Sequence, residues 1–299
     1  MEVVPPDSTT VSTERQALIF GLISVLLWST VATGFKLGLT TMSVLQLLFM
    51  GTAVSWLVFL ICAGWQRAFK IEPGDRLLVV VFGLINPCIY YLILFSAYDL
   101  LPAYIAQPLN YTWAITLSLL AIPLLKQRLT LRSILAICVS YFGVVILLTT
   151  GEAVDGAGLN PWGVVLALVS TLFWALYWIL NTRSKSAPIA LMFWSFTVAL
   201  PILALATLST DGMPKLSTDT LIYGLWVGLL EMGITFLTWQ RALRLTAHVS
   251  RISQLIFFSP FLSLVLIYFV LGEPVGLGAV VGLLVIVLGV WLNRSNNPA

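Results

Sequence analysis

Apolar runs of roughly 18 to 22 residues recur along the whole of this 299-residue chain, and no other feature constrains its fold as strongly. A helix needs about 20 residues, at about 1.5 Å per residue, to cross a hydrocarbon layer of about 30 Å. Lipid offers no partner to backbone N–H and C=O groups, and these runs lack the alternation of a barrel strand. With 60% hydrophobic and only 9% charged residues, the chain is predicted to be an all-α membrane protein.

Charged residues and Gly, Pro or Asn divide the apolar sequence into ten segments separated by short loops. Residues 1-16 and 293-299 are expected to be tails outside the membrane. The predicted transmembrane helices span residues 17-35, 42-63, 77-98, 102-125, 131-149, 161-180, 188-208, 218-239, 244-270 and 275-292.

The basic residues predict the orientation of these ten helices. All but two of the 15 Lys and Arg residues fall on one side of the predicted layer, and only Lys36 and Lys215 fall on the other. Cytoplasmic loops carry the excess of Lys and Arg, so both termini are expected in the cytoplasm. The basic side carries Arg15, Arg67, Lys70, Arg76, Lys126, Arg128, Arg132, Arg183, Lys185, Arg241, Arg244, Arg251 and Arg294.

The sequence also repeats itself. LISVLLW at residues 22–28 returns as LVSTLFW at residues 168–174, a spacing of 146 residues that also relates Gly143 to Gly289. We interpret residues 17-149 and 161-292, joined by a linker at 150-160, as two copies of a five-helix unit. Because five is odd, the second copy enters the membrane from the opposite side, as in inverted-repeat transporters. This architecture predicts alternating access around a site near the membrane midplane.

Residues 259–290, SPFLSLVLIYFVLGEPVGLGAVVGLLVIVLGV, resemble the end of a repeat in the drug/metabolite transporter superfamily. The resemblance lies in a proline-bearing span, a Gly-Glu turn and a glycine-spaced last helix: Pro260, Gly272, Glu273, Gly282 and Gly289. The ten-span, two-repeat layout resembles the EamA-type amino-acid and metabolite exporter branch over essentially the whole chain. This implies export of small organic solutes, with aromatic or hydrophobic amino acids as the expected substrates.

The first half departs from that pattern at two positions. Gln127 stands where the second half has Glu273, and no proline stands opposite Pro260. We therefore expect Glu273 to have a structural role near a helix end and not a general role in transport.

Polar side chains inside four spans are spaced to share a helix face, and such faces should turn toward a wet cavity. The strongest is Glu231, because a buried carboxylate is costly unless it is protonated or paired. It is expected either to hold a substrate amine or proton, or to bond a neighbouring helix. The candidate substrate-binding residues are Asn86, Tyr90, Tyr91, Gln107, Asn110, Tyr111, Trp174, Trp178, Glu231 and Gln254.

The sequence carries no Walker loop, HExxH or GxSxG motif, which argues against an ATP-driven pump or an enzyme and implies no cofactor or metal. A net charge of +3 spread over many loops does not indicate nucleic-acid binding. We expect a monomeric secondary transporter in a bacterial inner membrane, with coupling to protons left open. Export of hydrophobic or quaternary cations is an alternative, as is a membrane enzyme acting on lipid-linked sugars.

Overall fold

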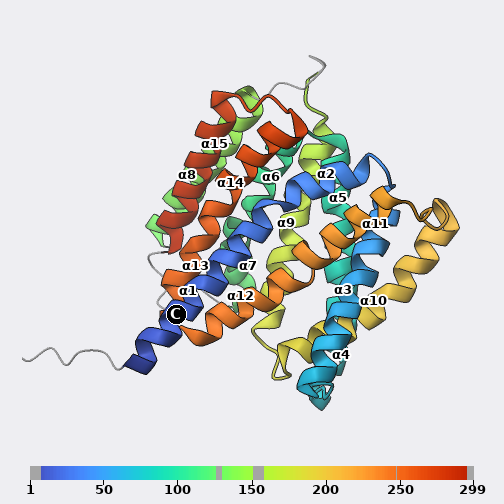
Figure 1. Ribbon diagram of the computed structural model, residues 1–299. Helices are drawn as coiled ribbons and strands as arrows, with labels where there is room; N and C mark the ends of the chain where they lie inside the picture. The colour runs from blue at the N-terminus through green and yellow to red at the C-terminus, as the bar shows by residue number, and fades with distance from the viewer. Residues whose placement is uncertain (1–7, 126–129, 151–157, 247, 295–299) are drawn as a thin grey trace, which may run out of the picture.

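The computed structural model describes residues 8–125, 130–150, 158–246 and 248–294, which form a bundle of helices (Figure 1). The first half contains α1 (Ser8–Ser29), α2 (Val31–Leu39), α3 (Val44–Gln66), the 3-10 turn η1 (Pro73–Asp75), α4 (Arg76–Gly83), the π-helical η2 (Leu84–Ile89), α5 (Tyr90–Leu100), α6 (Ala103–Tyr111), α7 (Trp113–Leu125) and α8 (Leu131–Thr150). The second half contains α9 (Pro161–Asn181), α10 (Pro188–Thr210), α11 (Thr218–Leu225), the π-helical η3 (Trp226–Glu231), α12 (Ile234–Leu245), α13 (Val249–Gln254), the 3-10 turn η4 (Leu255–Phe258), α14 (Ser259–Leu266), the π-helical η5 (Ile267–Leu271) and α15 (Leu277–Arg294).

Within the described residues, 8 helical stretches are long and apolar enough to cross a membrane, and each corresponds to one of the predicted spans. The other two predicted spans are also helical. Residues 102-125 form α6 and α7 with a break at Thr112, and residues 275-292 form α15, whose apolar part is shorter. The chain is thus a multi-pass helical membrane protein.

Two predicted boundaries differ from the structure because charge ends a membrane segment but does not end a helix. The first helix was expected to begin at residue 17 and begins at Ser8, since residues 8–16 contain neither Pro nor Gly. The segment 244-270 was expected to be one helix. Instead α12 continues to Leu245, Thr246 takes extended backbone angles, and a new helix starts at Val249.

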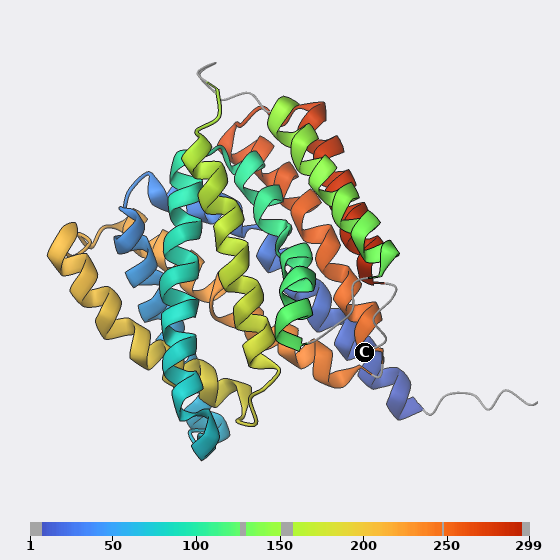
Figure 2. The same cartoon turned by 180° about the vertical axis from the view of Figure 1, so that it is seen from behind.

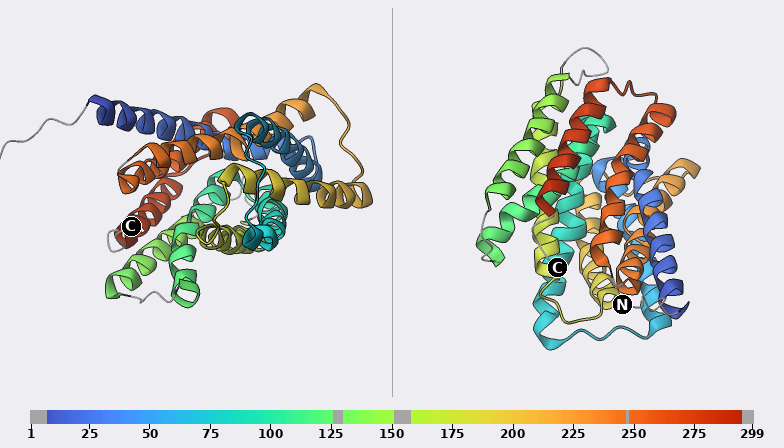
Figure 3. Two further views of the ribbon diagram at one scale, coloured as in Figure 1. Left: turned by 90° about the horizontal axis from the view of Figure 1, so that it is seen from below. Right: turned by 90° about the vertical axis from the view of Figure 1, so that its left-hand side faces the viewer.

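The two halves of the chain interlock. Helix α1 packs on α12 and α14 of the second half, and its counterpart α9 packs on α5 and α7 of the first half. Helices α3 and α10 pair with each other, as do α8 and α15, so the most extensive pairings among the described helices all join one half to the other. Figure 2 shows α9 running between the helices of the first half, in the opposite direction to α1. Figure 3 shows that α1 begins and α15 ends toward the same end of the bundle.

Repeat-related glycines explain the close α8–α15 pairing. A Cβ atom on Gly143 would lie 2.7 Å from the carbonyl oxygen of Gly282, and a Cβ on Gly289 would collide with Ser140. The Ser140 hydroxyl donates to the carbonyl of Ile286 at 3.1 Å. Small residues let transmembrane backbones approach closely, which is the main source of helix attraction where lipid replaces water.

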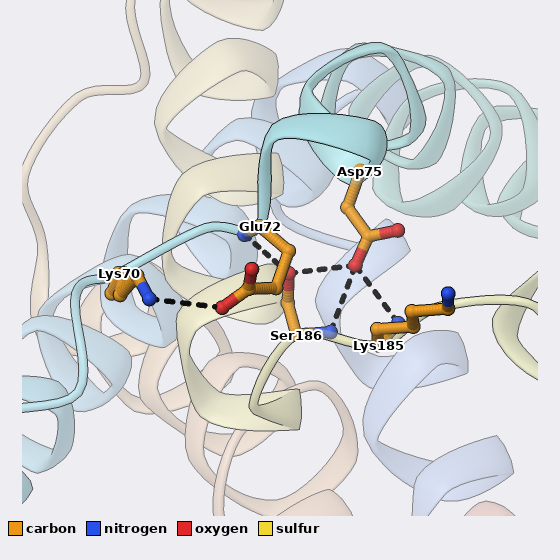
Figure 4. Close-up of polar contacts among 5 residues, drawn as sticks. All are labelled: Lys70, Glu72, Asp75, Lys185 and Ser186. Atoms are coloured by element: carbon orange, nitrogen blue, oxygen red, sulfur yellow. Dashed lines mark hydrogen bonds and ion pairs between the residues drawn. The ribbon is translucent and has the colours of Figure 1, made fainter.

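A carboxylate joins the two halves at the basic end. Oδ2 of Asp75 accepts hydrogen bonds from the backbone N–H groups of Lys185 (2.9 Å) and Ser186 (2.8 Å) in the α9–α10 loop. The hydroxyl of Ser186 donates to the same oxygen at 2.7 Å (Figure 4). The hydroxyl of Ser184 donates to it at 2.9 Å. Buried carboxylate oxygens that accept several N–H and O–H bonds hold loops in one geometry.

A second carboxylate makes the related connection at the opposite end. Oδ2 of Asp211, after α10, accepts from the hydroxyl of Ser43 at 2.6 Å, and that hydroxyl oxygen also caps α3. The side chain of Gln46 donates to the backbone carbonyl of Gly212 at 3.0 Å. Each half therefore fastens the start of the other half's second long helix, one at each end of the α3–α10 pair.

We predict that Asp75→Ala lowers the thermal unfolding midpoint of the detergent-purified protein by several degrees, because four donors lose a buried acceptor. Asp219→Ala, which removes an exposed carboxylate, is the control and should change the midpoint much less. Differential scanning fluorimetry checks both. Equal shifts in the two variants would show that the Asp75 contacts do not fasten the two halves.

Candidate functional site

A cavity of about 420 Å³ lies between the two halves. Helices α1, α2, α5, α6 and α7 of the first half contribute to its wall, and α9, η3, α12 and residues 253–256 of the second half complete it. Its size is within the range of pockets that hold small organic molecules. Seven of the predicted site residues line it: Tyr90, Gln107, Asn110, Tyr111, Trp174, Trp178 and Glu231.

The other three predicted site residues do not line the cavity. Tyr91 is buried behind the wall, where its hydroxyl donates to Glu231. Asn86 is buried too, and its Oδ1 atom has no hydrogen-bond partner among the described residues. Gln254 is exposed. The neighbouring Ser253 lines the cavity.

Aromatic residues outside the ten candidates also line the cavity, among them Trp28, Tyr98, Trp113 and Trp239. The repeat held a signal for Trp28, because it lies 146 residues before Trp174. If equivalent positions of the two repeats face the same site, Trp28 is expected in the cavity wall because Trp174 is. Trp239 shares a helical stripe with Glu231 in the sequence, whereas Trp113 has no such signal, since aromatic residues are frequent throughout the chain.

Trp174 is the centre of the aromatic wall. It stacks on Tyr90, with ring centroids 4.6 Å apart, and meets the edges of Trp113 and Phe236 at 6.4 and 5.8 Å. Trp28 contacts the same Phe236 at 5.9 Å. The two repeat-related tryptophans thus meet around one phenylalanine, and together they present large apolar faces to the cavity.

The third span of each half is interrupted near the polar groups of the wall: Asn86 in η2 has non-helical backbone angles before Pro87, and η3 is a π-helical turn. η2 in the first half immediately precedes Tyr90 and Tyr91, and η3 in the second half ends at Glu231. A π-turn inserts a residue into the helical repeat and displaces the side chains that follow it, and such turns are frequent at functional sites. In the first half the interruption is the kink at Asn86 and Pro87, and in the second half it is the π-turn that ends at Glu231.

Glu231 is the one carboxylate among the described residues of the wall, and its side chain is only 7% exposed. Its Oε1 accepts a hydrogen bond from the hydroxyl of Tyr91 at 2.9 Å. The Trp28 side chain also lies close enough to stabilise the carboxylate, and Oε2 has no partner of good hydrogen-bond geometry among the described residues. No Lys or Arg is found among the described lining residues. The Tyr91 contact joins Glu231 to the neighbouring helix α5, and the second oxygen is buried.

The cavity is closed at the end opposite the basic loops. Phe35 and Tyr98 are each 1% exposed there. The ammonium of Lys36 donates to the backbone carbonyls of Tyr98 and Leu101, both at 2.7 Å, and so fastens α2 to the junction between α5 and α6.

Glu273 stabilises the same closed end. Its two carboxylate oxygens accept from the backbone N–H groups of Ala103 (3.0 Å) and Tyr104 (3.1 Å). These N–H groups belong to the first turn of α6, which has no partners for them within the helix and attracts negative charge. The expected structural role of Glu273 near a helix end is confirmed. Gln127, its counterpart, lies outside the described residues.

At the basic end the cavity is open. Thr182 is exposed, and Leu243 and Ser253 are partly exposed. Thr182 is also the repeat counterpart of Lys36, at the spacing of 146 residues. The ammonium that closes one end is therefore replaced by a short hydroxyl side chain at the other, and the structure is open toward the side of Arg183 and Arg244.

Fold and cavity together define a membrane protein built for passage of small solutes, and comparison with known proteins agrees. The model of the EamA-like transporter family matches residues 15–149 and again residues 161–295. The chain therefore belongs to the EamA-like transporter family, with one family repeat in each half. It is a multi-pass membrane transporter of small solutes.

Relatives of similar length include a protein of Clostridium kluyveri described as an uncharacterized transporter. It is 24% identical over 294 residues, covering 95% of this chain and 94% of that protein. A protein of Archaeoglobus fulgidus with the same description is 23% identical, covering 90% and 95%. A solved crystal structure of a protein superposes with a TM-score of 0.65 at 20% identity, covering 93% of this chain and 96% of that one, and supports the fold.

We predict that Lys36→Met opens the closed end, because the carbonyls of Tyr98 and Leu101 lose their donor. In a chain whose native cysteines are replaced, Val31→Cys places a thiol in the cavity wall. A membrane-impermeant maleimide added from the Lys36 side should label it about tenfold faster in the Lys36→Met background, the factor for about 1.4 kcal/mol of lost closing energy.

Lys215→Met removes the other lysine of that side, which is exposed, and serves as the matched control. Its labelling rate should stay at the background value. Equal rates in all three backgrounds would contradict a closing role for Lys36.

Proposed function

We propose that this EamA-family chain is a secondary transporter that exports amino acids with aromatic or hydrophobic side chains, and related small metabolites. One observation supports a substrate with a positive group and an apolar body. Glu231 offers a buried carboxylate oxygen without a partner, inside an aromatic wall that has no described basic residue. Such a wall favours a solute that carries a positive group and an apolar body.

The contacts of the wall match an amino acid of this kind part by part. The ammonium group would pair with Oε2 of Glu231, which removes the cost of an unpartnered buried carboxylate. The side chain would stack against the faces of Trp174 and Tyr90, where aromatic pairs gain free energy beyond the area they bury. A cavity of about 420 Å³ leaves room for such a molecule with some water.

Transport would follow alternating access between two inverted five-helix repeats, with ten spans and both termini in the cytoplasm. On that orientation the cavity described above is open to the cytoplasm and closed to the outside by Lys36 and Glu273. Export then requires the Lys36 end to open and the Thr182 end to close. We place the protein in a bacterial inner membrane as a monomer, with proton exchange at Glu231 as the candidate coupling step.

Export of hydrophobic or quaternary cations is the second candidate, because the same carboxylate and aromatic faces suit a cation. Aromatic side chains attract quaternary ammonium groups through their negative faces. Such a solute would use Glu231 and Trp174 but would leave the amide-bearing side of the cavity, at Gln107 and Asn110, without a charged partner.

Reconstitution of the purified protein in liposomes separates the two candidates. Vesicles loaded with labelled phenylalanine, leucine, glutamate or tetraphenylphosphonium are followed with and without a pH gradient. Our proposal predicts protein-dependent flux of phenylalanine and leucine, and little flux of glutamate. Flux of tetraphenylphosphonium alone would favour the cation exporter, and flux of none of these solutes would contradict both.

We predict that Glu231→Gln lowers phenylalanine flux about tenfold or more, because an amide lacks the charge that pairs with the ammonium group. The amide still accepts the Tyr91 hydroxyl, so the fold should be retained. Glu72→Gln, at a partly exposed surface ion pair with Lys70, is the control and should transport at the wild-type rate. A Glu231→Gln protein with normal flux would remove Glu231 from the substrate site.

A further inference from the structure

Two residues of the cavity wall have buried polar atoms without hydrogen-bond partners, and the atoms have opposite character. Oε2 of Glu231 is an acceptor, and the indole N–H at Nε1 of Trp178 is a donor. Buried polar groups are nearly always hydrogen-bonded, so each exception needs an explanation. One acceptor and one donor left unpaired in the same cavity are explained together by a solute that carries both a donor and an acceptor.

The ring of Trp178 is held in place by its neighbours. It lies one helical turn after Trp174 on α9, and the two rings meet edge to face with centroids 5.9 Å apart. Tyr177 contacts it from the adjacent position at 5.8 Å. An indole fixed in this way presents its N–H in one direction, and little side-chain entropy is lost when it binds a solute.

Gln107 supplies a second donor. It lines the cavity from α6, and the hydroxyl of Tyr98 donates to its Oε1 atom. That bond fixes the orientation of the amide, so the group that Gln107 can offer to a solute is its Nε2 amino group. The helix that carries Gln107 is in turn anchored at its first turn by Glu273.

We propose that Trp178 Nε1 and Gln107 Nε2 bind the carboxylate of the transported solute while Glu231 binds its ammonium group. This inference rests on the proposed function and narrows it: the site is specific for zwitterionic α-amino acids over amines and over carboxylates without an amine. The carboxylate is recognised by neutral donors. A solute that has a carboxylate but no ammonium group therefore brings its negative charge to a cavity that already contains Glu231 and is rejected.

The test compares three probes that share one side chain: L-phenylalanine, phenethylamine, which lacks the carboxylate, and 3-phenylpropanoate, which lacks the ammonium group. Binding of each to the full chain in nanodiscs is measured by isothermal titration calorimetry. Trp178→Phe keeps an aromatic ring and removes only the N–H. Trp162→Phe makes the same change on the same helix at a residue that is 70% exposed, and is the matched control.

The wild-type protein and Trp162→Phe should bind L-phenylalanine more tightly than phenethylamine, and should bind 3-phenylpropanoate weakly. Trp178→Phe should weaken binding of L-phenylalanine about tenfold or more, because a hydrogen bond to a charged group is lost. Its binding of phenethylamine should not change. Gln107→Glu, which puts a negative charge beside the bound carboxylate, should show the same selective loss and keeps the inference testable if Trp178→Phe does not fold.

Equal weakening of L-phenylalanine and phenethylamine in both variants would overturn the inference, as would unchanged binding of L-phenylalanine. Tighter binding of phenethylamine than of L-phenylalanine by the wild-type protein would also overturn the inference, and would favour a cation exporter. Binding of none of the three probes would overturn both the inference and the proposed substrate class.

Discussion

The packing of each half's first span against the third and fourth spans of the other half determines everything else in this molecule. Neither half encloses a cavity alone, because α1 is covered by α12 and α14 while α9 is covered by α5 and α7. In lipid, no hydrophobic effect between helices drives this packing of each half against the other. It depends on close packing and on polar contacts between the halves, which the α8–α15 glycines and the two Asp–Ser connections provide.

The interlocking also explains how a carboxylate can remain within the bundle. Glu231 ends a π-turn of the second half, and the first half supplies the Tyr91 hydroxyl that satisfies one of its oxygens. The remaining oxygen stays unpaired beside an aromatic wall to which both halves contribute. A buried, half-satisfied acid is costly to stability, and such groups in membrane proteins are typically functional. The polar groups of the substrate would supply the missing partners.

The sequence predicted the helical segments because length and apolar composition are enough to define them. It also placed Gln107, Asn110 and Tyr111 correctly on one face, since helical spacing determines which side chains share a face. It did not predict the break at Thr246, and Gln254, which was expected in the cavity, is exposed. The π-turn η3 was not predicted either, because no local residue pattern marks it, whereas Pro87 marks the kink in η2.

The contacts that close one end of the cavity could not be predicted from the sequence of a single chain. Lys36 was interpreted only as an exception to the distribution of basic residues, yet its ammonium holds α2 to two carbonyls. Glu273 was expected near a helix end, but its partner helix, α6, lies in the other half. Such contacts arise from tertiary proximity between segments 62 to 170 residues apart in the chain, which local spacing cannot encode.

Distance measurements at the two ends of the cavity test the central claim, that the interlocked halves expose one site to each side in turn. In a chain without native cysteines, spin labels at Arg183→Cys and Arg241→Cys report the basic end. Labels at Thr40→Cys and Pro274→Cys, both exposed positions, report the closed end. Electron–electron double resonance with and without L-phenylalanine should reveal populations in which the first distance shortens and the second lengthens. Distances that stay fixed, or that lengthen together at both ends, would contradict the account.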